Sequence, residues 1–174
     1  MNVLVVNAGS SSLKYQLFDT ANDTVYAKGI CERIGTDGSL IEHKQLVKGL
    51  KIEEAHPMKT HADAMKIVVE KLLDKEYGCI SSMSEIEAVG HRVVHGGPYF
   101  SGSMLLGGDV LEKLKLCNDC APLHTPPAIM GIEVSTHLPS LTAEMEEPLP
   151  MWQVTMRVPS VLPRILHISA ETKR

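Results

Sequence analysis

The chain changes its pattern of hydrophobic and polar residues near residue 50. Residues 1–6 form an apolar run, which is typical of a buried strand. Three further strand-like segments follow at residues 14–19, 24–31 and 39–43, separated by residues that favour turns. We therefore expect a meander of antiparallel strands added to the opening strand.

From residue 60 to residue 77 the period changes, and the apolar residues recur at helical spacing. The residues of this stripe are Ala64, Ile67, Val68 and Leu72. Thr60 is a candidate N-cap, and Gly78 is the expected stop at the carboxyl end. The segment is therefore predicted to be an amphipathic helix.

A further strand and two further helices are predicted downstream. Residues 86–97 are typical of a strand that runs into a glycine turn. A helix is expected from residue 110 to about residue 117 with Asp109 as its cap, and another from about residue 126 to residue 137, because proline is tolerated in a first turn. Strands and helices thus alternate after a strand-rich start, which predicts an α/β fold with a mixed sheet flanked by helices.

From Pro139 onward neither period persists. Five of the ten prolines fall in this last part of the chain, and proline interrupts both helices and central strands. We therefore expect a domain over residues 1–139 and a divergent, irregular tail over residues 140–174.

Composition narrows the class of protein. The 174 residues are 44% apolar and 22% charged, which is typical of a soluble globular chain. The net charge of −4 and an aromatic content of 4% argue against a nucleic-acid surface. No apolar stretch has the length of a membrane span, and no secretory signal opens the chain. We therefore expect a cytoplasmic protein with no nucleic-acid or membrane partner.

The four cysteines include a single Cys-x-x-Cys motif, Cys117 to Cys120, with His124 four residues later. A redox motif would be expected to open a helix, whereas this one closes a predicted helix. A second pair that would complete a zinc site is missing from the sequence. We therefore interpret the cysteines as ordinary reduced thiols.

Residues 7–14, Asn-Ala-Gly-Ser-Ser-Ser-Leu-Lys, carry the strongest chemical signal. They bring a glycine, three hydroxyls and Lys14 to the end of the opening strand, and these groups together suit a polyphosphate. The segment is not a P-loop, because Leu13 precedes the lysine and Tyr15 follows it. Two interpretations remain open at this point, a phosphate hairpin and a plain turn between two strands.

Two other residues could hold an anion. Arg92 lies between Gly90 and Gly97, and its guanidinium can grip a carboxylate or phosphate with two hydrogen bonds; the alternative is a structural ion pair. His124 precedes a predicted helix, where it could bond an oxyanion or only satisfy the local backbone. His91 and His95 flank Arg92, but without an acidic partner they are not interpreted as metal ligands.

Several of these motifs together resemble the amino-terminal half of acetate kinases over roughly residues 1–139. The motifs are residues 7–14, 90–97 and 121–126 with Gly131-Ile132-Glu133. The resemblance implies the ribonuclease-H-like half of the actin-type kinase fold, shared with sugar kinases and heat-shock ATPases. It also implies transfer of the γ-phosphoryl of ATP to acetate with Mg²⁺, giving acetyl phosphate and ADP, by a protein that is a homodimer in the family.

The resemblance also implies roles for individual residues. On the nucleotide side, Asn7 would help to hold the metal, and Ser10, Ser12 and Lys14 would face the transferring phosphate.

On the substrate side, Arg92 would hold the acetate carboxylate. Val94 and Leu123 would form the pocket for the acetate methyl group. His124 would lie near the phosphoryl group in flight and is the candidate catalytic residue.

The chain departs from the family pattern after the last predicted helix. The family continues into a strand that ends in a catalytic aspartate, whereas Asp119 is the last aspartate here. We therefore expect the second kinase domain to be absent, the tail to come from a shifted reading frame or a truncated gene, and the chain to be weakly active or inactive. The alternatives are a propionate or butyrate kinase and a non-catalytic remnant that binds phosphate or a partner protein.

Overall fold

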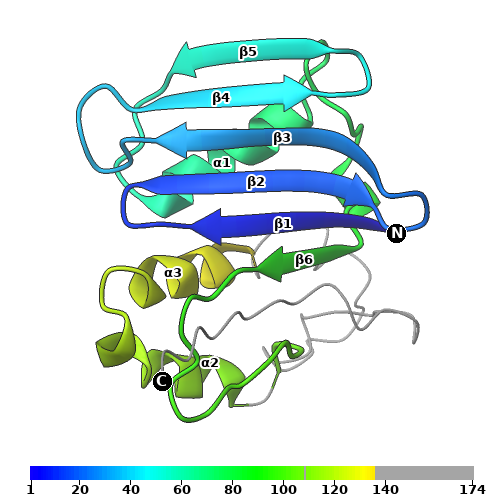
Figure 1. Cartoon of the computed structure of the whole chain (residues 1–174). Helices are drawn as coiled ribbons and strands as arrows, with labels where there is room; N and C mark the ends of the chain where they lie inside the picture. Colours follow the sequence, from blue (N-terminus) through cyan, green and yellow to red (C-terminus); the bar gives the residue numbers. More distant parts are fainter. Residues whose placement is uncertain (108, 136–174) are drawn as a thin grey trace, which may run out of the picture.

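The computed structural model describes residues 1–107 and 109–135 and is built on a six-stranded mixed sheet (Figure 1). The strand order is β5-β4-β3-β2-β1-β6. The strands are β1 Asn2–Ala8, β2 Ser12–Asp19, β3 Thr24–Glu32, β4 Leu40–Gln45, β5 Leu50–Ala55 and β6 Ala88–His91. This arrangement confirms the predicted α/β class.

The sheet grows from β1 in two different ways. From β1 to β5 each strand pairs antiparallel with the next one along the chain, so the predicted meander is confirmed. On its other side β1 pairs parallel with β6, where Val3 lies opposite Ala88 and Val6 opposite His91. A parallel pair needs a crossover connection, and here α1 lies within that connection.

The sequence analysis missed β5. Its residues Lys51 and Glu53 are exposed, and they alternate with half-buried Leu50 and Ile52. The weak apolar signal follows from the place of β5 at the edge of the sheet, where charged side chains are common.

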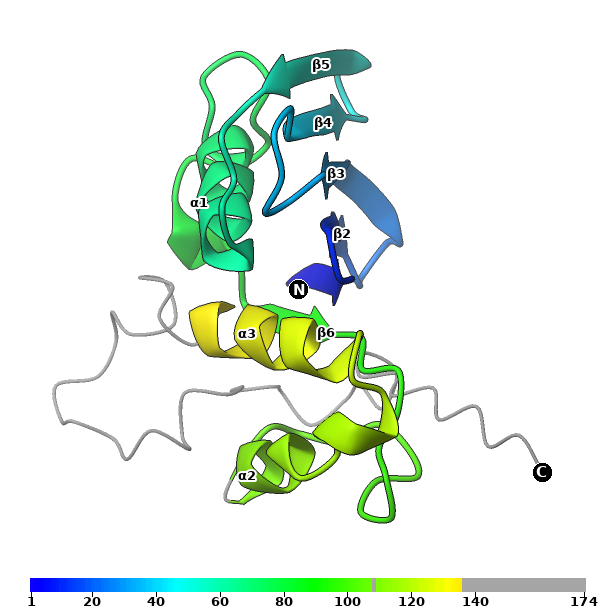
Figure 2. The ribbon, with the colours of Figure 1, turned by 90° about the vertical axis from the view of Figure 1, so that its left-hand side faces the viewer.

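The helices of the described part are α1 His61–Leu72, α2 Val110–Lys115 and α3 Thr125–Ser135, with 3₁₀ turns η1 Met83–Glu85 and η2 Asn118–Cys120. Figure 2 shows α1 and α3 on the same side of the sheet. The opposite face carries no helix from the described residues (Figures 1 and 2). None of these helices is long and apolar enough to cross a bilayer.

Helix α1 begins where the sequence predicts and ends earlier. Thr60 and Asp63 form a capping box, in which each side chain accepts the backbone N–H of the other. The expected stop at Gly78 is wrong, because the helix ends at Leu72. The Asp74 carboxylate accepts two backbone N–H groups of the following turn, and a Cβ at Gly78 would overlap the Asp74 backbone. The glycine therefore serves this turn and not the helix end.

Some details of the other elements differ from the predictions. Strand β6 stops at His91, well before residue 97. Asp109 precedes α2 but makes no side-chain cap bond; it pairs instead with Lys113 at 2.8 Å. Helix α3 begins at Thr125, and its predicted end at residue 137 lies outside the described residues, as does the predicted tail 140–174.

A buried polar row crosses the centre of the sheet. Tyr15, Gly29 and His43 lie side by side on β2, β3 and β4. His43 Nε2 donates to the Tyr77 carbonyl at 2.9 Å, so its Nδ1 accepts from the Tyr15 hydroxyl at 2.5 Å. Burial raises the pKa of Tyr15 and lowers the pKa of His43, so both side chains are neutral near pH 7. The tyrosine reaches the histidine across Gly29, which has no side chain in the way.

We predict that Gly29→Ala destabilises the fold. A Cβ at this position would lie 2.5 Å from the Tyr15 hydroxyl oxygen and would also overlap the Glu42 carbonyl. Such overpacking typically costs about 1–3 kcal/mol of the free energy of unfolding, which urea denaturation measures. Gly102→Ala is the matched control, because its Cβ would meet nothing within 4 Å and should change stability by less than about 0.5 kcal/mol. Equal effects of the two substitutions would contradict this account.

The fold should also lose stability in acid through His91. Its Nε2 atom is buried without a hydrogen-bond partner among the described residues, and burial lowers the pKa of His91 from 6.5 to about 4. Between these values the unfolded chain binds the proton more tightly, so the stabilisation is complete above about pH 6.5 and is lost as the pH falls toward 4.

We therefore predict a smaller pH dependence for His91→Leu. Between about pH 6.5 and pH 4 this residue contributes a slope of up to about 1.4 kcal/mol per pH unit to the free energy of unfolding. The variant should lose that part and keep the part due to His43, whose pKa is lowered in the same direction. Urea unfolding at several pH values measures both slopes, and identical slopes for wild type and variant would refute the assignment to His91.

Candidate functional site

The turn between β1 and β2 is held by three hydrogen bonds to its carbonyl groups. His61 Nε2 donates to the Gly9 carbonyl at 2.6 Å. The N–H of Ile34 donates to the Ser11 carbonyl at 2.9 Å, and the N–H of Gly9 donates to the Ser12 carbonyl at 2.7 Å. Helix α1 and the loop after β3 therefore fix the turn from outside, and three of its carbonyl oxygens accept hydrogen bonds within the protein.

Several donors of the same turn are not used within the described part of the chain. Among the described residues nothing hydrogen-bonds the N–H groups of Ser10 and Ser11 or the hydroxyls of Ser10 to Ser12. Ser10 and Ser11 are exposed. Because three carbonyls of the turn are engaged and these N–H and hydroxyl groups are not, the turn presents hydrogen-bond donors to solvent, which suits an anion.

The structure brings Asn7, Lys14 and Arg92 to one face of the sheet. Asn7 and Lys14 are directly opposite each other in the β1–β2 ladder, so their side chains share a face. Arg92 follows His91, the partner of Val6, and its N–H continues the ladder to the Val6 carbonyl at 3.0 Å. Since side chains alternate along a strand, Arg92 lies on the same face as Asn7.

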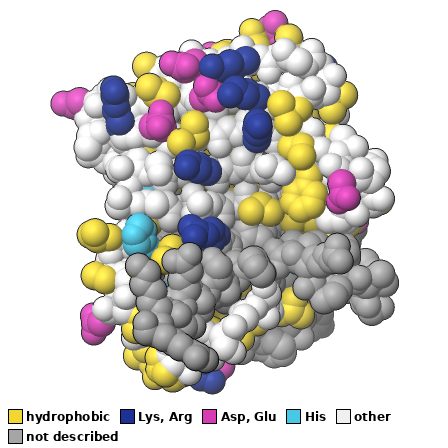
Figure 3. Space-filling view, viewed as in Figure 1, with side chains coloured by type: hydrophobic (Ala, Val, Ile, Leu, Met, Phe, Trp, Pro, Cys, Tyr) yellow, Lys and Arg dark blue, Asp and Glu magenta, His cyan; other side chains and the backbone are white. Residues whose placement is uncertain are grey.

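This face is opposite to the one that α1 and α3 cover. Ala8 lies on the helix side, where Gly131 of α3 approaches both Ala8 and the His91 ring. Figure 3 views the open face and shows Lys and Arg side chains extending down it across the strands. Arg92 and the hairpin therefore lie on the same side of the sheet, as a shared anion site requires.

The cations of this face differ in their partners. Lys44 and Lys51 each pair with Glu42 at 2.7 Å, and the hydrogen bonds from Lys44 and then Lys51 lower the pKa of Glu42 to about 2. Lys14 and Arg92 are exposed, and no carboxylate of the described residues pairs with either. The structure thus gives no support to a structural ion pair for Arg92.

The remaining predicted site residues lie in the segments after β6 and before α3, and no polar contact among the described residues joins them to Asn7, Lys14 or Arg92. Val94 is half-buried after β6, and Leu123 and His124 are exposed just before α3. Within the described ranges, no hydrogen bond or ion pair joins the His124 ring to Arg92 or to the hairpin. The structure therefore groups Asn7, the serine turn, Lys14 and Arg92 closely, and places the other three at the ends of neighbouring segments.

Asn7 offers a single neutral oxygen as a metal ligand. Its side chain is partly exposed on the open face, and no group of three His, Cys, Asp or Glu residues that could hold a metal occurs in the described part. One amide oxygen fits Mg²⁺ only where the ion takes most of its ligands from phosphates and water, a mode that Mg²⁺ commonly uses.

Sequence reasoning missed the role of His61. In the sequence, His61 is simply the first residue after the predicted helix cap, and it lies 52 positions from Gly9. Neither spacing nor periodicity signals a contact across such a separation. The buried ring and its bond to the turn appear only when α1 packs on the sheet.

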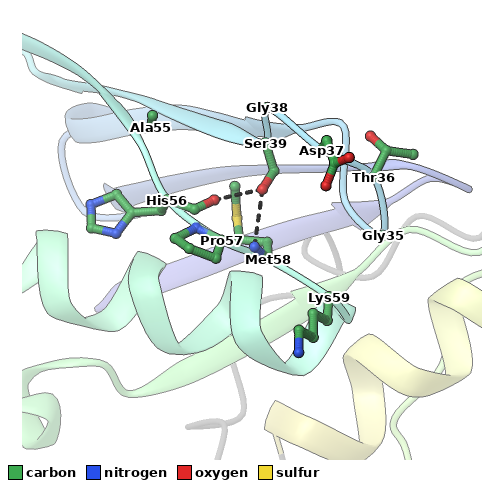
Figure 4. Close-up of a pocket in the computed structure, with 10 residues that line it drawn as sticks. All are labelled: Gly35, Thr36, Asp37, Gly38, Ser39, Ala55, His56, Pro57, Met58 and Lys59. Carbon is green, nitrogen blue, oxygen red and sulfur yellow. Dashed lines mark hydrogen bonds between the residues drawn. The ribbon is translucent and has the colours of Figure 1, made fainter.

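An open cavity of about 610 Å³ lies beside the site but contains none of the predicted site residues. Residues 35–39 and 55–59 line it (Figure 4). Its buried Ser39 hydroxyl donates to the His56 carbonyl at 2.6 Å and accepts the Met58 N–H at 3.0 Å, as the dashed lines in Figure 4 mark. These bonds tie the two lining segments together and leave no unpaired Ser39 donor for a ligand.

Comparisons with known proteins agree on one family. A sequence model of the Acetokinase family matches residues 2–145. The acetate kinase of Clostridium kluyveri is 54% identical over 132 residues, which are 76% of this chain and 32% of that protein. The acetate kinase of Helicobacter hepaticus is 49% identical over 134 residues, covering 77% of this chain and 33% of that one.

Solved structures give the same result. The crystal structure of Porphyromonas gingivalis acetate kinase superposes with a TM-score of 0.75 at 39% identity, over 79% of this chain and 34% of that chain. A propionate kinase from Francisella tularensis superposes with a TM-score of 0.68 at 35% identity, over 78% and 33%. The chain spans about a third of the length of the relatives that it matches. The family model, the related sequences and the superposed structures all agree with the hairpin and the sheet described above. The chain therefore belongs to the acetokinase family.

Proposed function

We propose that this chain is part of a phosphotransferase that converts acetate and ATP to acetyl phosphate and ADP. The observation that carries the proposal is the common face of Asn7, Lys14 and Arg92 beside a turn with free donors. Phosphoryl transfer needs mainly in-line positioning and compensation of charge. An anion-binding turn and two cations that pair with no carboxylate of residues 1–107 and 109–135 supply both on one surface.

On the nucleotide side, the turn binds the phosphate that is transferred. The N–H groups of Ser10 and Ser11 and the hydroxyls of Ser10 and Ser12 donate to its oxygens, and the Lys14 ammonium offsets its charge. Because His61 holds the Gly9 carbonyl, the donors keep their direction when the phosphate arrives. Preorganised donors of this kind avoid the cost of reorientation during the reaction.

On the acid side, Arg92 binds the acetate carboxylate with two parallel hydrogen bonds. Val94 and Leu123 contact the methyl group and limit the length of the acid. One carboxylate oxygen then faces the phosphate on the turn. His124 donates a hydrogen bond to the phosphoryl group as it moves between the two oxygens.

Mg²⁺ fits as a partner of the nucleotide, with the Asn7 amide oxygen as one protein ligand. When bound, the ion offsets negative charge on the phosphates. The cytoplasm, where ATP and small acids are found, is the compartment that we propose.

A longer acid is the nearest alternative substrate. The Francisella tularensis relative of 35% identity is a propionate kinase, and one methylene changes the free energy of the transition state by only about 1–3 kcal/mol. The side chains of Val94 and Leu123 would decide between the acids. Relative rates on acetate, propionate and butyrate, measured with a full-length relative that carries this half, separate these alternatives.

We predict that the isolated 174-residue chain forms acyl phosphate far more slowly than a complete relative such as the Clostridium kluyveri enzyme. The chain covers 32% of that protein, and no aspartate follows Asp119, so it lacks many of the groups that bind and position the reactants in the complete relative. Hydroxamate trapping of the acyl phosphate measures the rate. A rate close to that of the complete enzyme would overturn the expectation of weak or absent activity.

We predict further that the isolated chain binds Mg·ATP through Lys14. Lys14→Ala should weaken binding about tenfold or more, because a hydrogen bond to a charged group contributes about 1.5–3 kcal/mol. Lys66→Ala is the matched control, since this exposed lysine lies on α1 and pairs with no carboxylate of the described part. Calorimetric titration gives the affinities. Binding of inorganic phosphate equal to that of ATP would favour a non-catalytic remnant, and equal effects of both substitutions would contradict the assigned site.

A further inference from the structure

The Cys-x-x-Cys motif forms a tight turn that brings its two cysteines together. Helix α2 ends at Lys115, Cys117 precedes η2, and Cys120 is the last residue of η2. The N–H of Cys120 donates to the Cys117 carbonyl at 3.0 Å. Such a bond between residues three apart holds their Cα atoms within about 7 Å, close to the range of about 4.4–6.8 Å that a disulfide needs.

The two sulfur atoms also approach a common point. A Cβ at Gly97 would lie 2.7 Å from Cys117 Sγ and 3.5 Å from Cys120 Sγ. Gly97 has a φ of +54° and therefore favours glycine on backbone grounds as well. Both sulfur atoms therefore lie next to Gly97, and the missing side chain of this glycine leaves room for them.

The two thiols differ in access. Cys117 is buried, its Sγ donates to the Lys113 carbonyl at 3.3 Å, and burial raises its pKa. Cys120 is exposed. A dissolved oxidant can therefore reach Cys120 first, and Cys117 is placed to react only with its neighbour.

We propose that Cys117 and Cys120 are a redox modification site that closes to a disulfide. The oxidant is a low-molecular-weight disulfide of the glutathione class. The Cys120 thiolate attacks it, forms a mixed disulfide and releases one glutathione thiolate. The Cys117 thiol then loses its proton to solvent and attacks Cys120 Sγ, which releases the second glutathione. Two protein thiols are oxidised, and one glutathione disulfide is reduced to two thiols.

This proposal departs, for Cys117 and Cys120, from the interpretation of all four cysteines as ordinary thiols. The sequence places the motif at the end of a helix, and α2 does end there. The structure adds that the same residues open a 3₁₀ turn and that Gly97, twenty residues earlier in the chain, leaves room for both sulfur atoms.

The disulfide would lie between the two segments that flank the proposed acid site. Gly97 ends the segment that begins at Arg92, and Cys120 directly precedes the segment with Leu123 and His124. Closing the disulfide moves both sulfur atoms relative to Gly97, so these segments would change together. The proposal itself depends on the thiols alone and holds whether or not the chain is a kinase.

Mass spectrometry of the folded chain tests the site directly. After incubation with oxidised glutathione we expect the intact mass to fall by about two mass units, the two hydrogens lost. Proteolysis without reduction should then yield a peptide with Cys117 and Cys120 joined, while Cys31 and Cys79 still react with a thiol reagent. Reduction with dithiothreitol should restore the original mass.

Two variants make the assignment specific. Cys120→Ser should keep its mass under the same treatment, because the buried Cys117 then has no partner. Cys79→Ser, which removes the other partly exposed thiol, should still lose the two hydrogens. Thiols that stay reduced, stable glutathione adducts on Cys120, pairing with Cys31 or Cys79, or disulfide-linked dimers would each overturn the proposal.

Discussion

The hydrogen bond from His61 to the Gly9 carbonyl is the contact on which the candidate site depends. A glycine-serine turn at the end of a strand is flexible by itself, and its carbonyls and N–H groups compete for the same space. By engaging the Gly9 carbonyl at 2.6 Å, the buried imidazole leaves the turn with donors facing solvent. The two other carbonyl bonds, from Ile34 and from Gly9 itself, act in the same direction. Helix α1 therefore does more than cover the sheet, since its first residue sets the polarity of the turn.

The sheet supplies the second condition, which is the placement of Arg92. Parallel pairing with β1 puts β6 in a register where Arg92 and Asn7 share a face. A shift of one residue in that register would turn the guanidinium toward α3 and bring the His91 ring to the open face. The core residues of β1 prevent such a shift, because Leu4 and Val6 are fully buried on the helix side. Packing of apolar side chains thus fixes the position of a charged one.

Local signals in the sequence were sufficient for much of this fold. The capping box at Thr60, the alternation in β2 and β3 and the glycine after β6 depend on neighbouring residues, and they could be predicted. Strand β5 escaped prediction because an edge strand with charged side chains has little apolar pattern. The predicted helix stop at Gly78 was wrong, because a glycine is needed there for close packing against the Asp74 backbone and not for ending the helix. His61 could not be found, since its partner is far away in the chain and only packing brings them together. For the site, the residue types were enough to suggest the hairpin and Arg92 as anion-binding groups. That they share a face could be established only from the register of the strands in the sheet.

The parallel pairing of β1 with β6 has a kinetic consequence. The hairpins from β1 to β5 join residues that are close in the chain, whereas β6 meets β1 across about eighty residues. Contacts between distant residues form late, because closing a long loop costs entropy before any contact stabilises it. We therefore expect Arg92 to arrive beside Asn7 late in folding. An anion held by both segments would bind only the finished arrangement and would favour it by mass action, so the substrate could act as a folding aid for the surface that receives it.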